Sequence, residues 1–100
     1  MELPRTEAQL RERQDALRSQ FVVAELDLAI TFCEVAVTTN DPARYARNIA
    51  NAQEAYSSAL YFLKRNHLES TLALEINEKL LRLKPLLARF DPAFLTSQTQ

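Results

Sequence analysis

Apolar residues dominate one stretch of the chain, residues 21–37, which reads FVVAELDLAITFCEVAV. On a helix of 3.6 residues per turn, several polar side chains of this region share one narrow stripe. The stripe consists of Asp27, Thr31, Glu34 and Thr38. An apolar surface this wide predicts a central helix that at least two other helices cover. A membrane span is the alternative, but three carboxylates would be costly in hydrocarbon, and a span needs about 20 largely apolar residues. We therefore expect no membrane segment.

The helix that contains this stretch is expected to begin well before it. No residue between Arg5 and Thr39 is a helix breaker, so the sequence predicts one long first helix over about residues 5–39, with Thr6 in reach as its N-cap. Its first half carries few apolar residues, and Leu10 and Leu17 stand one heptad apart among charges of both signs. We expect the second half to lie in the fold and the first half to protrude from it.

The clearest break in the chain is the sequence Asn-Asp-Pro at residues 40–42. Asp41 is a good N-cap, and Pro42 suits the first position of a helix, where its missing N–H leaves no bond unmade. A second, amphipathic helix is predicted from about residue 42 to residue 65. Its apolar side chains return every three or four residues at Tyr45, Ile49, Ala52, Tyr56, Ala59, Leu60 and Leu63.

A third helix is predicted over about residues 68–90, after a short corner in which Asn66 is a candidate cap. Its apolar positions are Leu72, Ile76, Leu80, Leu83, Leu87 and Phe90, with Glu75, Glu78, Lys79, Arg82 and Lys84 outside. Pro85 lies within this pattern, so the helix either kinks there or stops at Lys84 and restarts. A kink is favoured because the apolar positions stay in phase. Asp91 and Pro92 signal one more short turn, and residues 96–100 are expected to be a frayed tail.

The sequence contains no glycine, which sheets and tight hairpins usually need in their turns. Helices joined by short capped corners can do without it, and short corners force neighbouring helices to run antiparallel. The fold class is therefore predicted as all-α: an up-down-up antiparallel three-helix bundle with a long first helix and a Pro-kinked third helix. At 100 residues the chain fits a single helical domain, residues 1–100.

Counting residues outward from the Asn40 corner gives an approximate register between the helices. It places Arg47 near Glu34 and Tyr56 near Glu25, with Asn77 of the third helix at the same level as that second pair. A carboxylate in an apolar environment is disfavoured unless it is hydrogen-bonded. We therefore consider a buried polar layer made by Glu25, Tyr56 and Asn77. In the alternative, Glu25 lies at a helix boundary and extends to water.

The residues offer little for catalysis. Cys33 is the only cysteine and lies inside the apolar stretch, and His67 is the only histidine, so CxxC chemistry and sites with several His ligands are excluded. Without glycine there is no Gly-rich phosphate loop. We expect neither enzymatic activity nor a cofactor or metal. The net charge of −1 gives no general attraction to nucleic acid. An N-terminal sequence without a signal-peptide pattern predicts a cytoplasmic location.

One part of the second helix has a recognisable spacing of small and aromatic residues. In the stretch ANAQEAYSSAL these are Ala52, Tyr56, Ala59 and Leu60. The stretch resembles the second helix of a tetratricopeptide repeat and is also similar to the second helix of MIT-type trafficking domains. The resemblance covers about ten residues. The other half of the tetratricopeptide pattern would fall on residues that do not fit it: Ala36, Thr39, Asn40 and Ala43. The spacing is interpreted as tight helix packing.

Two classes of function remain. The first is a non-enzymatic protein–protein interaction module that presents a groove or a helix face to an unknown protein. The second is a self-associating structural bundle, a weak homodimer formed through Leu10 and Leu17 on the first half of the first helix. A weaker alternative is anion or small-ligand binding at the start of the second helix. The residues of that patch are Arg44, Tyr45, Arg47, Asn48 and Asn51. The acidic side chains of the facing first helix explain the positive charge there equally well.

Overall fold

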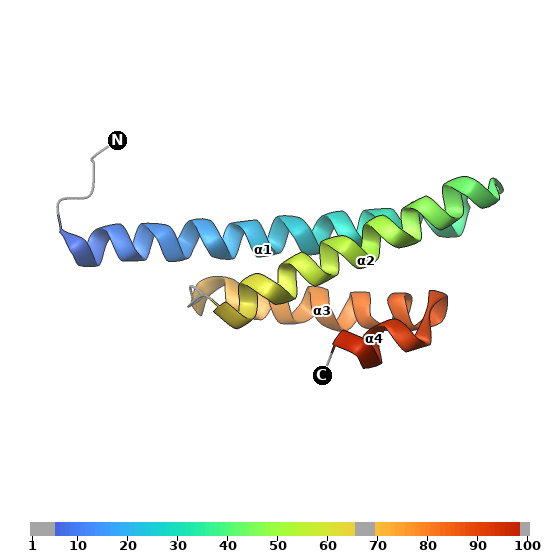
Figure 1. Ribbon diagram of the computed structural model, residues 1–100. Helices are drawn as coiled ribbons and strands as arrows, with labels where there is room; N and C mark the ends of the chain where they lie inside the picture. Colours follow the sequence, from blue (N-terminus) through green and yellow to red (C-terminus); the bar gives the residue numbers. More distant parts are fainter. Residues whose placement is uncertain (1–5, 66–69, 99–100) are drawn as a thin grey trace.

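The computed structural model describes residues 6–65 and 70–98, and nearly all of these residues are helical (Figure 1). The helices follow one another as α1 (Glu7–Thr38), α2 (Pro42–Arg65), α3 (Ser70–Phe90) and α4 (Pro92–Gln98). No strand occurs within these ranges, so the prediction of an all-α fold is confirmed. Without any β-structure, the fold depends entirely on how the helices begin and how their side chains pack.

Both predicted helix starts are present. The Thr6 hydroxyl accepts a hydrogen bond from the backbone N–H of Gln9 at 3.1 Å, and the Gln9 side chain accepts one from the Thr6 N–H at 3.2 Å. This reciprocal pair is a capping box, which satisfies two otherwise free N–H groups. At α2, the Asp41 carboxylate accepts hydrogen bonds from the N–H groups of Ala43 at 2.9 Å and Arg44 at 3.4 Å. The chain can therefore turn between α1 and α2 without glycine.

The end of the chain is more helical than expected. α3 continues through Pro85 as one helix, so it does not stop at Lys84. Thr96 and Ser97, which were expected to belong to a frayed tail, are part of α4. Packing against α2 holds this short helix in place. The ring of Phe94 packs edge-on against Tyr56 with centroids 5.9 Å apart. The corner with Asn66 and His67, and the predicted start of the third helix at residue 68, lie outside the described residues.

The core lies between α1 and the helices that pack on it. Figure 1 shows α2 and α3 along the second half of α1, whose first turns extend beyond them. The buried apolar side chains are Val22, Leu26, Ala29, Ile30, Cys33 and Ala36 on α1, Ala52, Ala55, Tyr56 and Ala59 on α2, and Ile76, Leu83 and Leu87 on α3. Alanines on the α2 face let its backbone approach α1 closely, in agreement with the packing interpretation of that segment.

The molecule is elongated because of α1. Its extents are 53 × 31 × 19 Å, and the helix alone is roughly 48 Å long at 1.5 Å per residue. Residues 6–14 are all exposed, and the first buried residue of α1 is Ser19. The expected protrusion of the first half of this helix is therefore present in the fold.

Candidate interaction surface on the first helix

Helix α1 carries apolar side chains on two opposite faces. One face is the buried set described above. The other consists of five exposed apolar residues, Leu10, Leu17, Phe21, Leu28 and Val35, which we name the α1 seam. At 100° per residue these five fall within about 40° of one another, on the side roughly opposite the buried set. Leu17 is 57% exposed and Leu28 is 45% exposed, so the seam is open to solvent.

The seam follows a heptad repeat. Its members are separated by seven, four, seven and seven residues, which is the alternating three-and-four spacing of a coiled coil with one position skipped in each step of seven. The other positions of the same repeat are Gln14, Ala24, Thr31 and Thr38, and all of them are exposed. From Leu10 to Val35 the seam is roughly 38 Å long. A repeat maintained over this length is typical of a helix that pairs with another helix.

Two other helices pack on the apolar stretch, as expected, but they leave this face of α1 open. Helices α2 and α3 do not cover all of α1. Leu28 and Val35 therefore keep substantial exposure, although they lie in the half of α1 that packs against the other helices. Leu10 and Leu17 are exposed, as a protruding helix requires. Leu10 and Leu17 were predicted from the sequence as an interface, and the rest of the seam was not. The seven-residue spacing that joins Leu10 to Leu17, and Leu28 to Val35, was the signal that could have found it.

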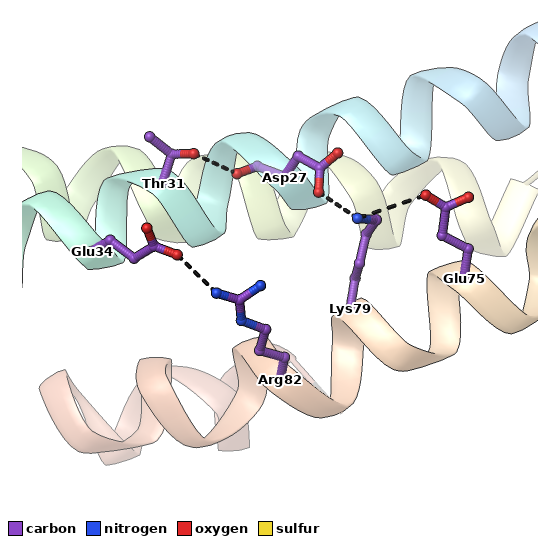
Figure 2. Close-up of polar contacts among 6 residues, drawn as sticks. All are labelled: Asp27, Thr31, Glu34, Glu75, Lys79 and Arg82. Atoms are coloured by element: carbon purple, nitrogen blue, oxygen red, sulfur yellow. Dashed lines mark hydrogen bonds and ion pairs between the residues drawn. The ribbon is translucent and has the colours of Figure 1, made fainter.

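One edge of the seam is fixed to α3 by ion pairs (Figure 2). The Lys79 Nζ lies 2.6 Å from the Asp27 Oδ1 and 3.7 Å from the Glu75 Oε1, and an Arg82 guanidinium N–H donates to the Glu34 Oε1 at 2.9 Å. The hydrogen bond to Asp27 is the main reason that the pKa of Lys79 is raised above its ordinary value. In the structure Glu34 pairs with Arg82 of α3, and Arg47 of α2 is exposed. The register that places Arg47 near Glu34 stays a prediction.

The other edge of the seam borders a hollow between α1 and α2. The hollow has a volume of about 380 Å³ and is lined by Glu25, Leu28 and Phe32 from α1 and by Asn51, Glu54, Ala55 and Ser58 from α2. Glu25 and Glu54 form no ion pair with any residue that the structure describes. The hollow therefore places two carboxylates beside the apolar seam.

Charge changes sign along the seam. The positions on either side of the heptad stripe carry Arg11, Arg13 and Arg18 in the first half of α1. The corresponding positions in the second half carry Glu25, Asp27 and Glu34. Each end of the seam therefore has the charge that would attract the opposite end of a similar helix.

The three residues of the predicted polar layer occupy different environments. Tyr56 is buried, and burial raises the pKa of its hydroxyl. Glu25 is half-buried at the hollow, and Asn77 is exposed. The neighbour of Asn77 on α3, Ile76, is buried, and Asn77 points about 100° away from it around the helix. Only Tyr56 therefore belongs to the core.

The predicted anion patch at the start of α2 does not converge on one point. The Asp41 carboxylate already accepts the first N–H groups of the helix, where an anion would bind. Tyr45 packs edge-on against Phe90 with ring centroids 5.8 Å apart, and the Asn48 side chain donates to the Arg44 carbonyl at 2.8 Å. Asn51 lines the hollow beside Glu25 instead. The arginine side chains Arg44 and Arg47 are exposed.

The remaining candidate chemistry is limited. Cys33 is buried in the core, where burial and the nearby Glu34 carboxylate raise its pKa to about 11. Within the described ranges, no three His, Cys, Asp or Glu side chains are grouped as metal ligands would be. In the same ranges, none of the helices combines the length and apolar character that spanning a bilayer requires. His67 lies outside the described residues.

Comparison with known proteins does not add a relative. Neither a protein-family model, nor a curated protein, nor a solved structure matches this chain.

Proposed function

We propose that the chain is a non-enzymatic protein–protein interaction module whose binding surface is the α1 seam. The observation that carries this proposal is the exposure of five apolar side chains in a heptad repeat along α1, of which Phe21 also packs against Phe62 of α2. Single exposed apolar residues are ordinary on protein surfaces. A row of several exposed apolar residues bordered by charge is the usual mark of an interaction site. An amphipathic helix is the partner whose shape fits such a stripe best.

The rest of the fold acts as the support for this surface. We infer that α1, α2 and α3 form an up-down-up bundle, with a kink in α3 at Pro85, because the helices are joined by short corners and Pro85 cannot donate a backbone hydrogen bond. The ion pairs from Lys79 and Arg82 and the alanine-rich contact with α2 hold α1 on its buried side. The absence of enzymatic activity and the cytoplasmic location stay predictions.

Position-specific photo-crosslinking tests the proposed surface. A photoreactive phenylalanine analogue replaces Leu28 in the seam and, as a matched control, Leu81 on α3, which is even more exposed at 73%. Both proteins are illuminated in an extract of the native cell. We expect covalent adducts, with another protein or with a second copy, from position 28 and few from position 81. Equal adduct yields at the two positions, or no adduct at position 28, would contradict the proposal.

A further inference from the structure

We propose that the occupant of the α1 seam is a second copy of this chain, whose own α1 lies antiparallel to the first. This inference rests on the proposed function, since it identifies the partner of the same surface. Three properties of the seam support it: the side chains that would meet at each level, the charges beside them, and the area that the pairing covers.

The side chains match in one antiparallel alignment of the two α1 helices. In this alignment, a residue of one copy lies level with the residue of the other copy for which the two residue numbers add up to 45. Leu10 then meets Val35 of the second copy, and Leu17 meets Leu28 of the second copy. At the centre Phe21, whose ring also packs against Phe62 of its own α2 with centroids 4.5 Å apart, meets the small Ala24 side chain. The polar residues Gln14 and Thr31 meet each other. Every other pair of heptad positions between Leu10 and Val35 joins two apolar side chains. The two-fold axis passes between residues 22 and 23, and every contact occurs twice.

The flanking charges match in the same alignment. On one side Arg18 approaches Glu25 of the second copy, beside the acidic hollow that also contains Glu54. On the other side Arg13 approaches Glu34 of the second copy, a carboxylate that also accepts a hydrogen bond from Arg82. Charges at these positions commonly determine the orientation of paired helices.

A parallel pair would bring like charges together. The basic positions that flank the seam in the first half of each α1 would lie beside the same positions of its copy, with Arg13 facing Arg18 across the pair. The acidic second halves would lie together in the same way. Like charges in direct contact are disfavoured, so the charge distribution selects the antiparallel orientation.

The size of the contact predicts a modest affinity. A two-helix seam roughly 38 Å long and about 10 Å wide covers roughly 400 Å² of each copy, which is below the usual size of stable interfaces. We therefore expect a dimer that dissociates at micromolar concentrations, on the order of tens of micromolar.

Charge reversal provides the test, because it separates the orientation from the apolar contact. Light scattering measures the mass of the wild type, of Arg18→Glu, of Glu25→Arg, and of an equimolar mixture of the two variants. We expect each variant alone to dimerise at least about fivefold more weakly, because both of its Arg18–Glu25 contacts become repulsive. In the mixture each contact again joins opposite charges, so dimers between the two variants should form as readily as in the wild type. Circular dichroism shows that each variant is folded.

Two results would overturn the inference. A wild type that stays monomeric at several hundred micromolar has no such dimer. A stronger dimer in Arg18→Glu indicates the parallel pair, since residue 18 would then face Arg13. Photo-crosslinking distinguishes this failure from failure of the proposed function. If the protein is monomeric but position 28 still forms adducts with other proteins, the interaction surface is retained. Only the identification of its occupant as a second copy is then wrong.

Discussion

Two leucines that stand two residues apart on α1 should lose very different amounts of stability on truncation to alanine. Leu26 is 0% exposed and belongs to the core, whereas Leu28 is 45% exposed and belongs to the seam. Both lie in the middle of the same helix, so Leu→Ala changes helix propensity by a similar small amount at each. The comparison of Leu26→Ala with Leu28→Ala therefore isolates the environment of the side chain.

The expected magnitudes follow from burial. Leu26→Ala removes apolar groups that are fully out of water and leaves a space that α2 and α3 close only in part, which should cost about 2–5 kcal/mol of the free energy of unfolding. Leu28 has roughly half of its side chain in water already, so Leu28→Ala should cost about 1 kcal/mol or less in the monomer. The same variant should weaken self-association, since Leu28 meets Leu17 of the second copy in the proposed dimer.

Urea unfolding followed by circular dichroism measures both effects. At about 1 µM the proposed dimer should dissociate, so the midpoint reports the fold of the monomer, while at several hundred micromolar it should also report the dimer. Leu26→Ala should lower the midpoint at both concentrations. Leu28→Ala should mainly remove the difference between the two concentrations. Equal losses for the two variants at low concentration would refute the account of α1 as a helix with one buried and one open apolar face.

Three further predictions concern other parts of the fold. Thr6→Ala should remove the capping box and speed amide hydrogen exchange in the first turns of α1, at a cost of about 0.5–2 kcal/mol to that local structure, while the urea midpoint of the monomer is unchanged. Lys79→Met should lower the free energy of unfolding by roughly 1 kcal/mol or less in dilute buffer and by nothing measurable in concentrated salt, because its partners Asp27 and Glu75 are largely exposed; an undiminished loss at high salt would exclude the ion pairs as its cause. The free energy of unfolding should fall as pH rises from 9.0 towards about 11, since the unfolded chain releases the Cys33 proton at its ordinary pKa of 9.0 while the folded chain keeps it to about 11; pH titration of Cys33→Ala should show a shallower fall.

Much of the fold could be predicted because local signals agreed with one another. The caps at Thr6 and Asp41 begin α1 and α2 as expected, and the apolar spacing of α3 placed Ile76, Leu83 and Leu87 in the core. These signals act within one or two turns of a helix. Continuation of helix beyond residue 95 was missed because α4 is held by a distant contact, the ring pair of Tyr56 and Phe94, which no local pattern records.

The candidate surface was only partly predictable for the same reason. Periodicity identified α1 as apolar on several faces but not which face α2 and α3 would leave open, so Leu28 and Val35 were expected to be covered. Lys79 and Arg82 were placed on the outer face of the third helix, yet long side chains at the edge of a helix can reach across to a neighbour. The choice between Arg47 and Arg82 as the partner of Glu34 depends on how α2 and α3 are rotated about α1, which residue counting does not determine.

The most direct measurement of the central claim is the distance between two copies of one label on α1. A nitroxide attached at Glu12→Cys lies on an exposed position away from the seam, and the native Cys33 is buried, so labelling at position 12 is selective. In the antiparallel pair, residue 12 lies level with residue 33 of the second copy, which predicts a separation of roughly 30 Å along the helix axis. Pulsed electron paramagnetic resonance at several hundred micromolar should show this distance. A single short distance, as in a parallel pair, or no dipolar signal at all would contradict the account.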